Sequence, residues 1–461
     1  MALANYHVCA EDENTFNDFP VRGATSADTG AEEAWLRALP WIQDCLAFHQ
    51  RCEKNTESPL PRRVLDLVAP SAKDSLRLCE AGEEAGRYLC LSHCWGDSEY
   101  SAKTTRLTLE QNKDNIPWDT LPKTFQDAIV FARWLGIRYL WIDSLCIIQD
   151  SNEDWLEESA KMVDIYRGAF LTLAATASPS DGGGLFHTRA PADHTRRVFG
   201  YTSGGMPYNF YVRLAIEHCT IRRHSFYLTT PKDFPLLSRA WVYQEILLSP
   251  RVIHFTEREL TWECMECLDC ECGSAKEERL SGDMPHKAHH SWALQESSDS
   301  HELHARWRTI VEQYSGLSLT LGKDKLPALS GLAKQMQRYR VGDQYLAGLW
   351  TETLWEDLLW YTMGKWKVSH DESEWRAPTW SWASVGAGVR YTVSGRDRCT
   401  EIYATMAHAR AVPVMAGDST GQLSSAEMVF QGRLIPGTVS SPAFVVHFAF
   451  KFRLFPFHPV V

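Results

Sequence analysis

Two carboxylates are placed where they could act on a ligand. Asp143 ends the apolar run RYLWID (138–143), and Glu245 lies in the otherwise apolar segment SRAWVYQEILL (238–248). An aspartate at the end of a buried strand can accept hydrogen bonds from a sugar hydroxyl, or instead from the backbone of the turn. A glutamate in apolar surroundings can stabilise positive charge that develops on a substrate. The alternative for Glu245 is a structural carboxylate that pairs with Arg239 or Arg251.

A second candidate segment is SHCWG (92–96), which follows the apolar residues YLCL. Its tryptophan could stack on a planar ring of a ligand or pack beneath the sheet, and its glycine permits a turn. Ser92 and His93 point to opposite faces of a strand, so their adjacency does not make a catalytic triad. The predicted ligand-binding residues are Ser92, Trp95, Gly96, Gln149 and Arg239.

Cysteines form the main candidate metal site. The segment CMECLDCECG (264–273) contains Cys264, Cys267, Cys270 and Cys272, and its CxxC spacing is that of a zinc knuckle. A zinc site usually joins two knuckles that are far apart in the sequence, and the acidic residues between these cysteines disfavour thiolates. The alternative is therefore four thiols on a loop without a metal, and zinc is predicted only as a candidate structural cofactor.

Alternating strand and helix patterns must position the two carboxylates. Apolar strands are expected at 88–92, from Tyr139 to Asp143 and at 169–175. The segments 120–137 and 152–168 between them carry apolar residues at helical spacing. Near-continuous apolar strands joined by helices predict an α/β fold with a parallel sheet. The segments that follow the first two strands should then meet at one edge of that sheet.

Other parts of the chain follow weaker patterns. Pro40 is expected to break the helical segment around residues 31–51, and a helix followed by a strand pair is expected over 238–264. These patterns predict five regions along the chain. They are an N-terminal helical and linker region (1–87), an α/β core (88–265), a Cys/His-containing loop region (266–300), a helical region (301–365) and a small β-rich C-terminal region (366–461).

Bulk composition excludes several classes of protein. The chain has 461 residues, 44% of them hydrophobic, and a formal net charge of -11, which argues against a protein that wraps nucleic acid. No run of roughly 18 apolar residues is present, so no membrane span is expected. The N-terminus does not resemble a secretory signal, and the 13 cysteines are irregularly spaced. A cytoplasmic, reducing compartment is expected.

Seven ordered segments together resemble a known family, the fungal heterokaryon incompatibility (HET) domain. They are YLCLSHCWG, LPKTFQDAIVFARWLGIRYLWIDSLCIIQD, SAKMVDIYRGAFLTLAA, GGLF, LSRAWVYQE, RVIHF and WEC, which cover residues 88–265 densely. The later segments LPALSGLAKQM and RAPTWSWASV look like sequences that often follow the domain. The resemblance implies a filamentous fungus, vegetative incompatibility and programmed cell death, with other incompatibility or signalling proteins as partners and self-association as a further expectation.

The same resemblance carries an enzymatic alternative. HET domains are similar to TIR-type folds, a flavodoxin-like arrangement, and some TIR domains hydrolyse NAD. By that analogy the chain would be an NAD nucleosidase with NAD as substrate, Glu245 and Asp143 as catalytic residues and Trp95 beside them. A third alternative is a HET-like protein recruited to a metabolic role.

Overall fold

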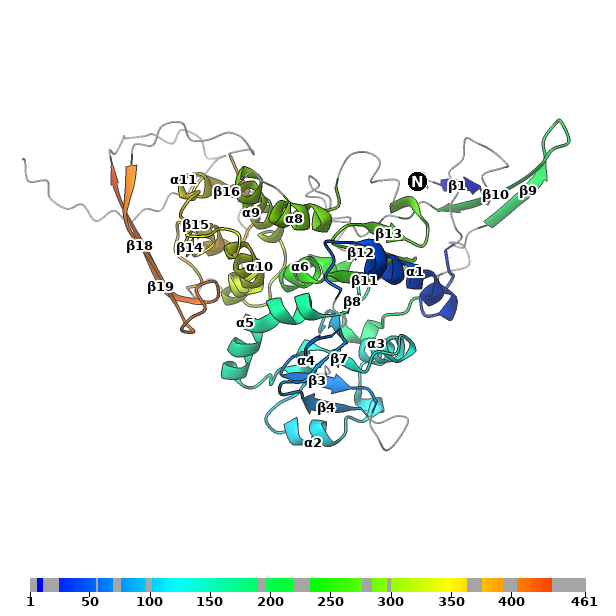
Figure 1. Cartoon of the computed structure of the whole chain (residues 1–461), viewed down its shortest axis with the longest axis horizontal. Helices are drawn as coiled ribbons and strands as arrows, with labels where there is room; N and C mark the ends of the chain where they lie inside the picture. Colours follow the sequence, from blue (N-terminus) through cyan, green and yellow to red (C-terminus); the bar gives the residue numbers. More distant parts are fainter. Residues whose placement is uncertain are drawn as a thin grey trace, which may run out of the picture. The chain divides into compact units, whose positions relative to one another are not determined.

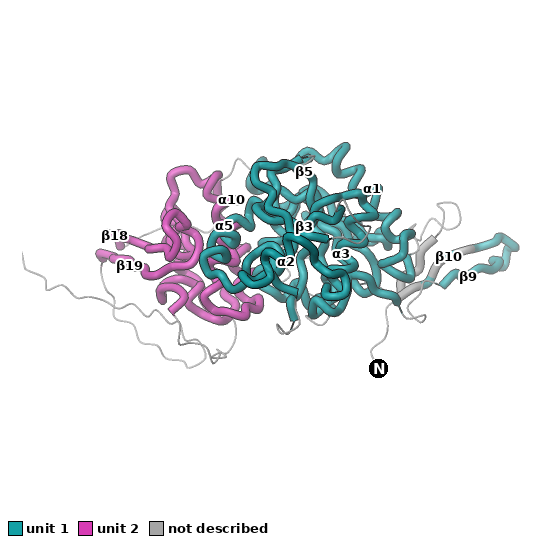
Figure 2. Tube along the Cα trace, turned by 90° about the horizontal axis from the view of Figure 1, so that it is seen from below, with its two compact units in different colours: residues 1–296 teal, residues 297–461 magenta. Residues whose placement is uncertain are grey.

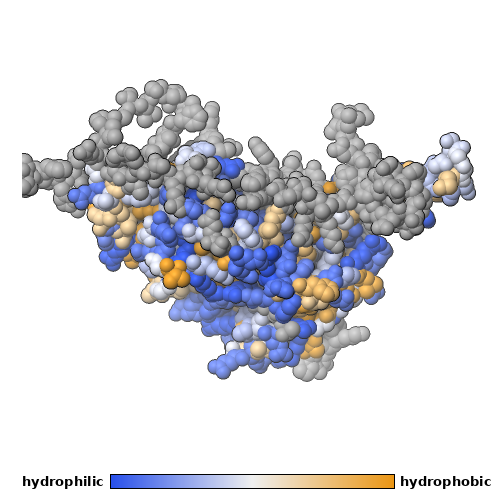
Figure 3. Space-filling view, turned by 45° about the horizontal axis from the view of Figure 1, so that its top comes forward, coloured by the Kyte–Doolittle hydropathy of each residue, from blue (hydrophilic) through white to orange (hydrophobic). Residues whose placement is uncertain are grey.

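The structure is a computed structural model of the chain (Figure 1). It forms two compact units, residues 1–296 and residues 297–461 (Figure 2). Hydrophilic residues dominate the face shown in Figure 3, and apolar ones occur there in small separate groups. The residues described are 6–10, 25–54, 57–68, 76–96, 102–189, 196–214, 216, 218, 233–275, 284–296, 300–362, 375–392 and 404–432.

An eight-stranded sheet forms the centre of the first unit. Its strand order is β13-β12-β11-β8-β6-β7-β3-β4. The strands are β3 (Arg63–Asp66), β4 (Arg77–Glu80), β6 (Tyr88–Ser92), β7 (Tyr139–Trp141), β8 (Leu171–Ala174), β11 (Arg251–Phe255), β12 (Leu260–Cys264) and β13 (Leu268–Cys270).

The middle of this sheet is parallel and its edges are antiparallel. β6 pairs in parallel with β7 and β8, and β8 pairs in parallel with β11. All residues of β6, β8 and β11 are buried, which is why their sequences are almost continuously apolar. The α/β prediction is confirmed, but the sheet is mixed rather than parallel throughout. At one edge, β3 pairs antiparallel with β7 and forms a hairpin with β4. At the other edge, β12 pairs antiparallel with β11 in a second hairpin.

Helices cover both faces of the parallel strands. α3 (Lys123–Trp134) connects β6 to β7, and α5 (Asn152–Gly168) connects β7 to β8. β7 and β8 lie on opposite sides of β6, so right-handed crossovers must place the two helices on opposite faces (Figure 1). On one face α3 packs against α1 (Glu32–Phe48) through Phe131 and Trp35. On the other face Trp155 of α5 contacts Trp241 of α6 (Ala240–Leu248).

Local sequence signals explain one end each of α5 and α3, but they fail within α1. Ser151 caps α5 by accepting a hydrogen bond from the backbone N–H of Asp154, and Gly136 follows α3 with a φ of 74°. The predicted break at Pro40 is wrong, since α1 continues through that residue. Its apolar stripe of Trp35, Ala38 and Ile42 is buried on both sides of the proline, so tertiary packing outweighs the lost hydrogen bond.

Smaller elements complete the first unit. β1 (Tyr6–Ala10), β9 (Arg196–Tyr201) and β10 (Pro207–Leu214) form a separate antiparallel sheet, and β2 (Ser58–Pro59) pairs with β5 (Ala85–Gly86). The remaining helices are α2 (Leu109–Asp114), α4 (Asp143–Cys146) and α8 (His286–Gln295). None of the helices in the described residues is both long and apolar enough to cross a membrane.

The second unit packs around buried tryptophans. Trp307 and Trp382 both donate their indole N–H to the carbonyl oxygen of Gly348, at 2.9 and 2.8 Å. Its helices are α9 (Ser300–Tyr314), α10 (Pro327–Gln337) and α11 (Leu354–Asp357). Its strands pair as β14 (Tyr345–Leu346) with β15 (Leu349–Trp350), β16 (Trp360–Thr362) with β17 (Val389–Tyr391), and β18 (Ala404–Pro413) with β19 (Leu423–Gly432). Of the predicted β-rich region 366–461, residues 366–374, 393–403 and 433–461 lie outside the described residues.

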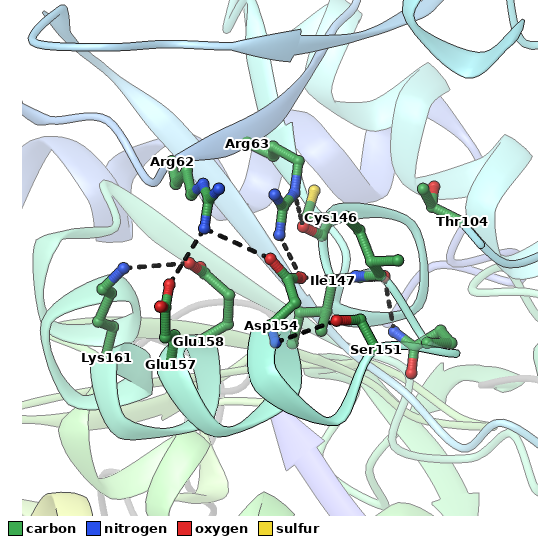
Figure 4. A network of polar contacts seen from close by, with 12 residues as sticks. Arg62, Arg63, Thr104, Cys146, Ile147, Ser151, Asp154, Glu157, Glu158 and Lys161 are labelled. Atoms are coloured by element: carbon green, nitrogen blue, oxygen red, sulfur yellow. Dashed lines mark hydrogen bonds and ion pairs between the residues drawn. The ribbon is translucent and has the colours of Figure 1, made fainter. Parts of the chain in front are cut away.

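A buried ion pair ties the start of α5 to β3 (Figure 4). The guanidinium of Arg63 is 1% exposed and contacts the carboxylate of Asp154. Arg63 also donates to the carbonyl oxygen of Cys146 at 2.7 Å, while Asp154 accepts from the backbone N–H of Ile148 at 2.8 Å. This network holds the loop after α4 in place, and that loop follows Asp143.

We expect Asp154→Ala to lower the free energy of unfolding by about 3–5 kcal/mol, because it leaves the Arg63 charge buried without its carboxylate. Glu157→Ala is the matched control, since it removes only an exposed contact with Arg62 and should cost less than about 1 kcal/mol. Urea unfolding of the full chain measures both values. Equal losses for the two variants would contradict this account of the ion pair.

Candidate functional site

The carboxyl ends of β6 and β7 meet α6 at one edge of the central sheet. β6 ends at Ser92, and Asp143 begins α4 just after β7. The two strands are parallel and adjacent, so the segments that follow them share the same edge. α6 packs against this edge and brings Glu245 to Ser92. Residues far apart in the sequence are thereby collected into one cluster.

Trp95 and Asp143 form the outer part of this cluster. The indole N–H of Trp95 donates to Oδ2 of Asp143 at 2.8 Å, and the backbone N–H of Ser144 donates to Oδ1 at 2.7 Å. The side chain of Asp143 is 25% exposed, so solvent or a ligand can reach it. The structure thus brings together the tryptophan turn and the aspartate turn that the sequence predicted at one edge.

Gly96 gives the chain the turn that places Trp95. Its φ is 72°, in the left-handed region, and a Cβ atom there would lie 2.5 Å from the Cβ of Ser180. Any larger residue would therefore both strain the backbone and collide with the neighbouring loop. In this structure the role of Gly96 is conformational.

Glu245 forms the inner part of the cluster. Its side chain is buried, and Oε2 accepts a hydrogen bond from the hydroxyl of Ser92 at 2.6 Å. Burial raises the pKa of Glu245 to about 7, and the nearby charge of Asp143 adds to this effect. The Ser92 hydrogen bond, the Arg239 charge and a hydrogen bond from Tyr166 act in the opposite direction. The carboxyl group can therefore gain or lose a proton near neutral pH.

His93 belongs to the same cluster, although the sequence analysis gave it no role. It is buried, its Nδ1 lies 3.8 Å from Oδ1 of Asp143, and its ring packs edge-on against Phe125. Burial lowers the pKa of His93, so the imidazole is neutral at pH 7. Its Nε2 has no hydrogen-bond partner among the described residues. Strand alternation does send Ser92 toward α6 and His93 toward α3, and both still border the site because β6 ends there.

Arg239 and Gln149 hold the backbone around the site. Arg239, just before α6, donates to the carbonyl oxygen of His93 at 2.9 Å. The side-chain amide of Gln149 donates to the carbonyl oxygens of Asp143 and Ile147, both at 3.0 Å. Gln149 therefore stabilises the loop after Asp143, and a ligand-binding role for either residue stays a prediction.

The cluster contains one buried carboxyl group, that of Glu245, and one partly exposed carboxylate, that of Asp143, and the two differ in what they can do. A carboxyl group with a pKa near 7 can act as a general acid or base under physiological conditions. A second carboxylate, that of Asp143, lies closer to solvent and can attract developing positive charge. Trp95 provides an aromatic surface beside it, with the ammonium of Lys103 at 5.5 Å from its ring centre.

The four predicted zinc-binding cysteines do not gather in one place. The β12–β13 ladder places Cys270 opposite Thr261, which is three residues from Cys264, so Cys264 and Cys270 point to opposite faces of the sheet. Cys264 instead lies with Cys45, His49 and Cys52, whereas Cys270 and Cys272 lie with His218 and Glu259. A single site made by all four cysteines is therefore replaced by two separate clusters.

Comparison with known proteins gives one match. Residues 88–245 match the family model described as heterokaryon incompatibility protein (HET). The matched segment begins with the first residue of β6 and ends at Glu245, so it contains the whole candidate site. No curated protein and no solved structure matches the chain.

We expect Glu245→Gln to change how stability depends on pH. The unfolded chain ionises this group near 4.5 and the folded chain near 7, so ionisation destabilises the folded state by about 3 kcal/mol at high pH. The stability of the unmodified protein relative to the variant should thus be greatest below pH of about 4.5, fall as pH rises to about 7, and stay constant above it. Urea unfolding across this range measures the difference.

The control for this experiment is Glu110→Gln, since the side chain of Glu110 is 82% exposed. That variant should follow the unmodified protein at every pH. A Glu245→Gln curve parallel to that of the unmodified protein would show that Glu245 is not a buried, protonatable group.

Proposed function

We propose that this chain, a HET-domain protein by its residues 88–245, acts in self/non-self recognition in a filamentous fungus and signals cell death through contacts with other proteins. The family match, which covers β6, β7, β8 and the first part of α6, is the observation that carries the proposal. The proposed partners are other incompatibility or signalling proteins in the cytoplasm. Self-association of the chain is part of the same proposal.

Induced expression of the full chain in a filamentous fungus should arrest growth and reduce viability. Glu245→Gln should weaken the response if the candidate site takes part in signalling, while Glu110→Gln should leave it unchanged. Viability staining and colony growth measure the effect, with protein levels compared by immunoblot. Normal growth at a protein level well above the natural one would contradict the death-signalling proposal.

A second candidate function, hydrolysis of the N-glycosidic bond of NAD, is favoured by the geometry of the cluster. In this reaction water adds to the ribose anomeric carbon, the bond to nicotinamide breaks, and the products are ADP-ribose, nicotinamide and a proton. Positive charge develops on the ribose in the transition state, and a nearby carboxylate stabilises it. Asp143 and Glu245 supply two carboxyl groups, and Trp95 offers a stacking surface for a planar ring.

Each residue has a distinct part in this proposal. Glu245 lies deepest and is held by the hydroxyl of Ser92, so its orientation does not depend on the ligand. Asp143 is fixed by Trp95 and by the backbone of Ser144, and its exposure lets it contact a ribose hydroxyl. Ser92 is thus a positioning residue, and the two carboxylates are the proposed catalytic residues.

Purified full-length protein should release nicotinamide from NAD, and Glu245→Gln should slow the release by roughly 100-fold or more. Glu110→Gln should retain full activity. If the ionised form of Glu245 is the active one, the rate should fall as pH drops below about 7. The absence of nicotinamide release at high protein concentration, including assembled forms, would remove the enzymatic proposal and leave the signalling proposal standing.

A further inference from the structure

Three thiols and an imidazole from separate segments of the chain meet between α1 and the end of β12. Cys45 lies in the last turn of α1, His49 follows that helix, Cys52 lies in the next loop, and Cys264 ends β12. Their ligand atoms all lie within 4.8 Å of one another, and Nδ1 of His49 is 3.3 Å from Sγ of Cys264. We propose that Cys45, His49, Cys52 and Cys264 bind a structural zinc ion that fastens α1 to the central sheet.

The geometry of the cluster matches what zinc requires. With Zn–S bonds of about 2.3 Å and tetrahedral angles, neighbouring sulfurs around one ion lie roughly 3.8 Å apart. Four atoms mutually within 4.8 Å need only a small contraction to reach that arrangement. Three soft thiolates and one imidazole favour zinc over hard cations, and a complete set of four protein ligands is typical of a structural rather than a catalytic site.

The three thiols are shielded from solvent, as the ligands of a closed structural zinc site are. Cys45, Cys52 and Cys264 are 0, 1 and 0% exposed, and none of them forms a disulfide. The backbone N–H of Cys267 donates to Sγ of Cys264 at 3.3 Å, a hydrogen bond that would stabilise and orient a coordinated thiolate. Cys267 itself is partly exposed and lies outside the group of four.

Two buried cations supply charge for such a site. Three thiolates and one zinc ion carry one net negative charge, which must be balanced away from water. Arg251 is fully buried and places Nη1 at 3.9 Å from Sγ of Cys45. Lys287 is also fully buried; the charges of Glu263, Cys264 and Cys52 act on its ammonium, which donates to the carbonyl oxygen of Ile246. Arg251 likewise donates to the carbonyl oxygens of Phe170 and Glu53, so backbone contacts contribute to the burial of both cations.

A second cluster carries the same inference independently, on the opposite face of the β12–β13 hairpin. His218, Glu259, Cys270 and Cys272 are all buried, and their ligand atoms also lie within 4.8 Å of one another. Nε2 of His218 is 3.3 Å from Sγ of Cys272 and 3.1 Å from Oε1 of Glu259. The two sulfurs are 3.3 Å apart. Two thiolates, an imidazole and a carboxylate again form a four-ligand zinc set.

Metal analysis of the full chain tests both sites. Protein purified without chelators should contain about two zinc ions per chain, as measured by plasma mass spectrometry. Replacement by Co²⁺ should give the thiolate charge-transfer absorption and the d–d bands of tetrahedral cobalt. Cys52→Ser and Cys272→Ser should each remove one ion, while Cys79→Ser, which alters a cysteine outside both clusters, should remove none.

The unmodified protein decides the question even if the variants do not fold. Removal of metal with a chelator should lower the unfolding temperature, and added zinc should restore it. Protein that is zinc-free as purified and shows no tetrahedral cobalt spectrum would overturn the proposal, as would disulfides joining Cys264 to Cys267 or Cys270 to Cys272. These readouts do not depend on NAD hydrolysis or on cell death, so the two kinds of proposal can fail separately.

Discussion

The parallel pairing of β6 with both β7 and β8 is the constraint on which the rest of the first unit depends. Because β6 lies between its two partners, the helices that connect them must cover opposite faces of the sheet. The same pairing brings the ends of β6 and β7 to one edge, where Trp95 and His93 both lie close to Asp143. α6 closes that edge and adds Glu245. The candidate site is thus a direct product of strand order.

Sequence patterns predict those parts of the fold that local chemistry determines. The apolar runs of β6 and β8 and the helical segments of α3 and α5 all appear where the sequence patterns predict them. The mixed character of the sheet is different, since nothing in the residues of β3 indicates that they pair with β7. Pairing between distant strands depends on tertiary packing, which a local pattern does not contain.

In the candidate site, too, some residues can be predicted from local sequence and others depend on tertiary packing. Asp143 and Glu245 were recognised because a carboxylate in an apolar segment is unusual, and the position of Asp143 after a strand indicated an edge. His93 was missed because a histidine beside a serine on one strand gives no sign of its neighbours. The CxxC spacing predicts one group of cysteines, but the faces that Cys264 and Cys270 occupy depend on the register of β12 against β13, which the local sequence does not contain.

That register has a consequence for how the chain reaches its final form. Shifting β13 by one residue along β12 would turn the side chain of Cys270 to the other face and remove its thiol from the second cluster. Zinc binding at the second proposed site would then favour the correctly aligned hairpin, because only that alignment brings Cys270 to His218, Glu259 and Cys272. Cys45, His49 and Cys52 precede the segment that matches the HET family model, and Cys264 follows it, so a zinc ion at the first proposed site would join the two flanks of that segment.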